Sequence, residues 1–165
     1  MKIFKPLTVK IKVLDPACMP RMDKDGDYID VFTSDEVRLK HLETAKIPLG
    51  IIVMAPAGCY CEMVARSSTH DRHKIIMWNA EAIMDYSFRG EKNVWKFFAL
   101  CLKEMRKTKY ITIPKGTKIA QFRIHLSQKA TVWQKLRWLF SNGIQIEIVD
   151  SVDKRSRGDS GHTGV

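Results

Sequence analysis

Arg66, Ser67 and Ser68 form the first of three short segments whose side chains suit phosphate chemistry. Arginine forms paired hydrogen bonds with phosphate oxygens, and short hydroxyl residues let the backbone approach an anion closely. A tripeptide of this kind is a weak signal alone, because similar triplets occur by chance in many loops. Since it follows a strand-like run, it predicts a phosphate-binding loop at a strand end.

The second segment, residues 79–91, contains Asp85 directly after the apolar pair Ile83 and Met84. A carboxylate at the end of a strand, beside bound phosphates, could orient and deprotonate a water molecule. In the alternative interpretation, Asp85 only caps the turn that ends at Gly90. The segment by itself leaves both roles open.

The third segment is the C-terminal stretch 151–165, which holds small residues, charges and three glycines. It has almost nothing to bury, so we expect a flexible tail after a domain that spans residues 1–150. Within the tail, Arg157 supplies a cation and His162 supplies a ring. This composition suits a segment that wraps around a ligand.

Strands are the elements expected to position these segments. Apolar and polar residues alternate over short runs separated by turn residues, and such runs indicate half-buried strands. The expected strands are residues 8–14, 28–32, 47–54, 61–65, 74–78, 94–102, 118–126 and 144–149. Many short strands at this spacing predict an all-β fold, of the sandwich, jelly-roll or barrel kind.

One segment departs from the strand pattern. Residues 130–140 place Val132, Leu136 and Leu139 on one helical stripe, and Gly143 follows shortly after. This arrangement predicts one short amphipathic helix with a glycine stop.

The composition limits the possible partners and the location. The chain has 165 residues and 28 Lys and Arg against 18 Asp and Glu, a net charge of +10 that favours a polyanionic partner. No apolar run approaches the roughly 18 residues of a membrane span, and the first residues lack the apolar core of a secretory signal. We therefore expect a cytoplasmic protein without membrane contact. Its four cysteines lack the spacing of a zinc site, so we expect reduced, mostly buried thiols.

Together the motifs resemble those of the trimeric dUTPase family, which has five of them. The resemblance covers most of the chain, from about Gly26 to Gly164. The matching segments are 26–32 with Asp30 at the acidic position, 65–68, 79–90, 116–122 and 157–162. In the third motif, Asn79 precedes Asp85 by six residues and Phe88 follows it by three. Each motif is short, but five in the right order are a strong signal.

The resemblance implies hydrolysis of dUTP to dUMP and pyrophosphate by attack of water on the α-phosphorus. Asp85 would be the general base, and Asp30 would hold, through water, a Mg²⁺ ion bound to the triphosphate. The implied substrate-binding residues are Arg66, Ser67, Ser68, Gln121 and Arg157 for phosphates, Asn79 for uracil, Phe88 for the deoxyribose and His162 over the base.

The resemblance also implies jelly-roll subunits in a homotrimer whose active sites lie between subunits. The tail of one chain would then close a site elsewhere in the trimer. Its cation is Arg157 in the register that keeps the motif without a gap. A second register would use Arg155 instead and leave Ser160 at the ring position.

Two other functions compete with this interpretation. A dCTP deaminase has the same fold and the Arg-Ser-Ser motif, but it needs a glutamate on the strand after the third motif. Residues 92–103 contain no acidic residue. A non-enzymatic nucleic-acid-binding protein would explain the net charge, and Lys103, Arg106, Lys107 and Lys109 form a basic run. No aromatic-basic motif accompanies this run, so nucleic acid is not expected as a partner.

Overall fold

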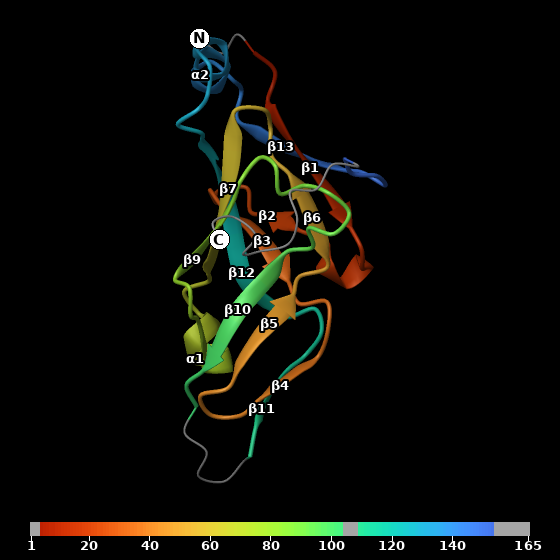
Figure 1. Cartoon of the computed structure of the whole chain (residues 1–165), viewed down its shortest axis with the longest axis vertical. Helices are drawn as coiled ribbons and strands as arrows, with labels where there is room; N and C mark the ends of the chain where they lie inside the picture. The colour runs from red at the N-terminus through yellow and green to blue at the C-terminus, as the bar shows by residue number, and fades with distance from the viewer. Residues whose placement is uncertain (1–3, 104–108, 154–165) are drawn as a thin grey trace, which may run out of the picture.

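Short strands make up most of the computed structural model, which describes residues 4–103 and 109–153 (Figure 1). The strands are β1 (Leu7–Val13), β2 (Arg21–Met22), β3 (Ile29–Phe32), β4 (Val37–Leu39), β5 (Thr44–Pro48), β6 (Ile51–Met54), β7 (Cys59–Ala65), β8 (Ile75–Met77), β9 (Glu81–Met84), β10 (Lys96–Cys101), β11 (Ile111–Ile113), β12 (Lys118–Leu126) and β13 (Ile144–Ile148). Two α-helices, α1 (Thr69–His73) and α2 (Val132–Leu139), and the 3₁₀ turn η1 (Pro16–Cys18) complete the fold.

The largest sheet has the strand order β2-β3-β12-β7-β9 and positions every predicted site residue of motifs one, two and four. Smaller sheets have the orders β13-β1-β6, β5-β10-β8 and β11-β4. The pairings are antiparallel except between β1 and β13, which run parallel. The predicted all-β class is therefore confirmed.

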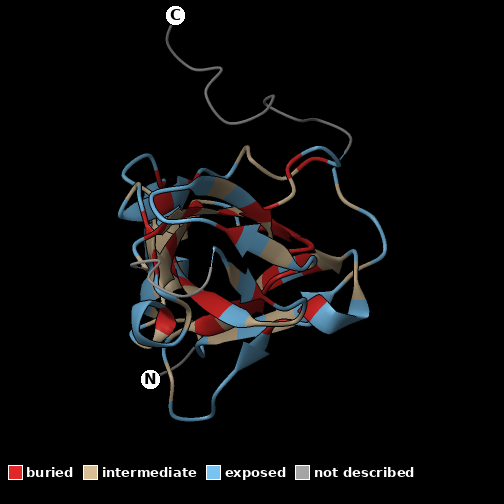
Figure 2. Ribbon diagram, turned by 90° about the horizontal axis from the view of Figure 1, so that it is seen from below, coloured by how far each residue is buried: buried red, intermediate tan, exposed pale blue. Residues whose placement is uncertain are grey.

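The core lies between the inner faces of these sheets (Figure 2). Trp95, Phe97 and Phe122 are at most 1% exposed, and the rings of Trp95 and Phe122 meet edge to face at 4.8 Å. Burial of each such side chain stabilises the fold by about 2 to 3 kcal/mol. On β7 the buried residues Cys59, Cys61 and Met63 alternate with outward residues. This alternation leaves the outer face of the five-stranded sheet polar.

The structure corrects two details of the predicted elements. The expected strand 47–54 is two strands, because the chain turns at Gly50, which has a φ of 60°. A β-carbon there would lie 2.7 Å from the sulfur of Cys18, so the turn needs glycine. The expectation of one helix was wrong, because α1 follows the Arg-Ser-Ser segment. It is tied to β12 by the Thr69 hydroxyl, which donates to the Ile119 carbonyl at 2.7 Å.

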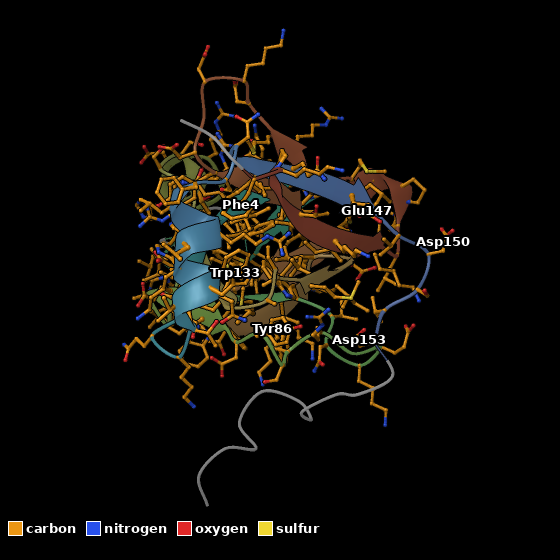
Figure 3. All side chains as sticks on the ribbon, turned by 90° about the horizontal axis from the view of Figure 1, so that it is seen from above. Phe4, Tyr86, Trp133, Glu147, Asp150 and Asp153 are labelled. Atoms are coloured by element: carbon orange, nitrogen blue, oxygen red, sulfur yellow. The ribbon has the colours of Figure 1, made fainter. Side chains whose placement is uncertain are left out.

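Helix α2 forms where the periodicity predicted it, and a capping box between Thr131 and Gln134 begins it. Its apolar stripe faces outward, since Val132 is 74% and Leu139 is 71% exposed. Trp138 packs on the core instead, and Trp133 meets Phe4 edge to face at 5.5 Å (Figure 3). In the described ranges, no helix is both long enough and apolar enough to cross a membrane.

Candidate functional site

The first cluster of predicted site residues lies on the outer face of the five-stranded sheet. Asp30 on β3 lies opposite Gln121 on β12, and Arg66 follows directly after β7, which pairs with β12 on its other side. The Arg66 guanidinium donates to one oxygen of the Asp30 carboxylate, and the Lys118 ammonium donates to the other at 3.0 Å. The structure therefore brings together Asp30, Arg66 and Gln121, as the motifs predicted.

Lys118 is a member of this cluster that the sequence analysis missed. It precedes Gln121 by three residues, a spacing that puts two side chains on opposite faces of a regular strand. The pairing of β12 with β3 shifts register between Lys118 and Ala120, and this irregularity lets Lys118 reach Asp30. The bulge depends on tertiary pairing, and nothing in the sequence marks it.

A cavity of about 510 Å³ opens at this cluster. Its lining combines the cations Arg66 and Lys118 with the amide of Gln121 and a set of carboxylates. The carboxylates are Asp23, Asp25, Asp27 and Asp30. Ser67 is exposed and Ser68 half-buried on the turn from Arg66 into α1. Cations, hydroxyls and an amide around one opening suit the oxygens of a polyphosphate.

Asp85 lies in a different place, directly after β9 and exposed to solvent. Since Met84 pairs with Cys61, Asp85 comes opposite Tyr60, at the start of β7. It borders a cavity of about 760 Å³ that is also lined by Tyr86, Tyr60 and residues that lead into α2. This position at a strand end is the one predicted from the apolar pair before Asp85.

The two clusters are far apart within one chain. Arg66 follows Tyr60 by six residues along β7, which corresponds to about 20 Å at the rise of an extended strand. Of the residues described, none lines both cavities. Between them on the same face, His125 pairs with Glu62 at 2.6 Å and its ring stacks on Tyr60. One chain therefore does not bring Asp85 to the Arg66 cluster.

Asn79 and Phe88 lie on either side of β9 in the sequence. Asn79 sits on the turn between β8 and β9, and its amide oxygen is buried with no hydrogen-bond partner among the described atoms. A buried acceptor of this kind is normally satisfied, so it suits a ligand that donates a hydrogen bond. Phe88 is half-buried and packs against the core.

Tyr86 is the aromatic residue that the motif analysis did not single out. Its ring is 45% exposed, lines the cavity at Asp85 and lies under the Arg89 guanidinium at 4.4 Å. Arg89 also pairs with Asp153 at 2.7 Å, which joins the Asp85 loop to the last described residues (Figure 3). The predicted tail residues Arg157 and His162 lie outside the described residues.

The cysteines behave as the sequence analysis predicted. All four are buried and free, and burial raises the pKa values of Cys18 and Cys59 to about 11. Burial also raises the pKa of Cys61. These thiols therefore stay protonated near neutral pH. Over residues 4–103 and 109–153, no group of three His, Cys, Asp or Glu side chains is arranged to hold a metal ion directly.

Comparison with known proteins decides the family. The sequence model of the dUTPase family matches residues 16–164. The chain belongs to the dUTPase family. A similar curated dUTPase is the SPbeta prophage-derived deoxyuridine 5'-triphosphate nucleotidohydrolase YosS of Bacillus subtilis, 31% identical over 160 residues. That match covers 96% of this chain and 99% of the relative. The deoxyuridine 5'-triphosphate nucleotidohydrolase of Finegoldia magna is 26% identical, with 94% of this chain and 99% of the relative covered.

Solved structures agree on the dUTPase fold. The dUTPase of Streptococcus mutans superposes with a TM-score of 0.66 at 12% identity, over 74% of this chain and 98% of the other. The dUTPase of Staphylococcus bacteriophage 80alpha, as its G164S mutant, superposes with a TM-score of 0.63 at 20% identity. That superposition covers 95% of this chain and 98% of the other. The jelly-roll arrangement implied by the motifs is thus supported by the family and by the fold.

Proposed function

We propose that this dUTPase hydrolyses dUTP to dUMP and pyrophosphate, in active sites that form between copies of the chain in a homotrimer. The observation that carries the proposal is the position of Asp85 and the Arg66 cluster at opposite ends of one sheet face. A site that needs both groups is complete when the Asp85 end of one copy meets the Arg66 end of the next. A head-to-tail contact of this kind closes into a ring.

Asp85 is the general base in this proposal. As an exposed carboxylate at a strand end, it can accept a proton from a water molecule aligned with the α-phosphorus. The strands β7 and β9 hold its backbone, and the turn bond from the Phe88 amide to the Asp85 carbonyl, at 2.9 Å, fixes the loop that follows. The water is then activated in a fixed place beside the substrate.

The cluster on the neighbouring copy binds the phosphates. Arg66 and Lys118 supply positive charge, Gln121 supplies an amide, and Ser67 and Ser68 supply hydroxyls. Asp30 orients both cations through its two oxygens. Charge developing on the phosphate oxygens is stabilised by donors that are in place before the reaction.

Asp30 also fits the proposed outer-sphere contact to Mg²⁺. A carboxylate has about four acceptor sites, and the bonds from Arg66 and Lys118 use one on each oxygen. The remaining sites can accept from metal-bound water, which suits an ion that keeps several of its waters. When bound to the triphosphate, Mg²⁺ neutralises charge on the leaving pyrophosphate. Among the structural neighbours, the dUTPase of phage phi11 has a structural Mg(II) ion in its title.

The base and sugar are recognised on the Asp85 side. The unpaired Asn79 amide oxygen can accept from the uracil N–H, and the ring of Phe88 is proposed to pack on the deoxyribose. Arg157 and His162 of the tail complete the site, the first on the terminal phosphate and the second over the base. In this scheme the tail, residues 151–165, serves the site and the domain 1–150 carries the fold.

Pyrophosphate release is the test. The purified protein should release pyrophosphate from dUTP and much less from dCTP, dTTP or UTP. Asp85→Asn should abolish turnover and keep the binding of a non-hydrolysable dUTP analogue, whereas Asp150→Asn, an exposed carboxylate that lines neither cavity, should leave turnover unchanged. Ammonia release from dCTP would favour the deaminase alternative, and substantial turnover by Asp85→Asn would assign the base elsewhere.

A further inference from the structure

The cavity at Asp85 has one wall that none of the five motifs provides. Ser127, Gln128, Lys129 and Gln134 line it, and they belong to the segment that joins β12 to α2. The opposite wall is the loop that carries Asp85, Tyr86 and Ser87. Among the lining residues in the described part of the chain, Asp85 brings the one negative charge and Lys129 the one positive charge.

Hydrogen bonds fix the backbone that carries Lys129. The Ser127 amide donates to the Gly58 carbonyl at 2.8 Å, and the Lys129 amide donates to the Ser127 hydroxyl at 3.2 Å. The Ala130 amide donates to the Ser127 carbonyl at 3.0 Å, and Ala130 is buried at 7% exposure. Lys129 is therefore presented from a closed turn that is anchored to the β6–β7 turn.

The start of α2 closes against that same β6–β7 turn. Thr131 accepts from the Gln134 amide, and the Gln134 side chain accepts from the Thr131 amide at 2.8 Å. Gln134 packs so tightly over Gly58 that a β-carbon at Gly58 would lie 2.7 Å from its side chain. The inserted segment and the turn thus fit together, and they hold Lys129 in a constant position relative to the Asp85 loop.

We infer that Lys129 binds a phosphate oxygen of the nucleotide on the Asp85 side of the site. This inference rests on the proposed function. There, a polyanionic substrate must approach the Asp85 carboxylate, while Arg66 and Lys118 of the same chain lie at the far end of β7. A cation in the Asp85 cavity offsets the repulsion between the carboxylate and the phosphates. A flexible ammonium on an anchored backbone is suited to this task as a point charge.

Lys129→Ala, Lys129→Arg and the control Lys135→Ala test the inference. Lys135 is exposed on α2 and does not line the cavity. We expect Lys129→Ala to lower kcat/KM for dUTP about 10-fold, the usual effect of one lost charged hydrogen bond. Lys129→Arg should stay within about 3-fold of the wild type, because it keeps the charge, and Lys135→Ala should be unchanged. The KM of Lys129→Ala should also depend less steeply on salt, since one ionic contact is missing.

Two outcomes would overturn the inference. Equal kcat/KM for Lys129→Ala and Lys135→Ala would show that Lys129 does not touch the substrate. A loss in Lys129→Ala accompanied by a lower Tm and an unchanged salt dependence would make its role structural. A wild-type protein that releases no pyrophosphate from dUTP would reject the proposed function instead. In that case, binding of a non-hydrolysable dUTP analogue to the wild type and Lys129→Ala would still decide whether Lys129 contacts phosphate.

Discussion

Mixing two inactive variants tests whether each active site takes Asp85 and Arg66 from different copies. Asp85→Asn removes the base, and Arg66→Gln removes the phosphate-binding fork, so each homotrimer should be inactive. The structure separates the two positions by about 20 Å along β7, so no single chain completes a site. Co-expression of the two variants should therefore restore pyrophosphate release, because each lacks what the other supplies.

The recovered activity follows from counting. In trimers assembled at random from equal amounts, the copy that provides Asp85 is intact there with probability of about one half. The same holds for the neighbour that provides Arg66. About a quarter of the sites should be intact, with about a quarter of wild-type activity. As a control, wild type co-assembled equally with the double variant should also give about a quarter, instead of the half expected for sites within single chains. No recovery in the first mixture, from two well-folded variants, would refute the reasoning.

Three further predictions concern single features of the chain. Phe88→Ala should weaken the preference for dUTP over UTP and lower the free energy of unfolding by about 2 kcal/mol, because its half-buried ring also packs on the core; retained discrimination in competition assays would assign the sugar contact elsewhere. Cys59 should react slowly with a thiol reagent at pH 8, because a pKa of about 11 leaves about one thiol in a thousand ionised, and rapid native-state labelling would contradict its burial. Deletion from Arg155 onward should keep the Tm and lower kcat/KM by about 100-fold, whereas full activity of the truncated chain would exclude a role for the tail.

Local sequence patterns predicted the elements that follow a simple periodicity. The strand 118–126 was predicted with both ends correct, because apolar and polar residues alternate along it. The run 47–54 has buried residues on both faces of β6, so no alternation marked the break at Gly50. Helix α1 has five residues and depends on the bond from Thr69 to β12, which sequence does not show. Periodicity located α2 but did not predict that its apolar stripe faces outward.

The motifs named residues of the site without giving their arrangement in space. Asp30 and Gln121 lie opposite each other because of strand register, and Lys118 joins them through an irregularity in that register. Lys129 lines the Asp85 cavity because an insertion folds back onto the turn at Gly58. Each of these juxtapositions joins segments distant in sequence. The order of motifs along the chain therefore left open which of them share a cavity.

The length of β7 explains why both halves of the proposed site lie on one face. Six residues separate Tyr60 from Arg66, and an even number returns the side chain to the same side of a strand. Asp85 comes opposite Tyr60, and Gln121 pairs with Val64 on that same side. A deletion of one residue within β7 would turn Arg66 towards the core face while Asp85 stayed outward. The phosphate-binding end would then be lost, so the spacing within β7 is part of the site as much as the motif residues themselves.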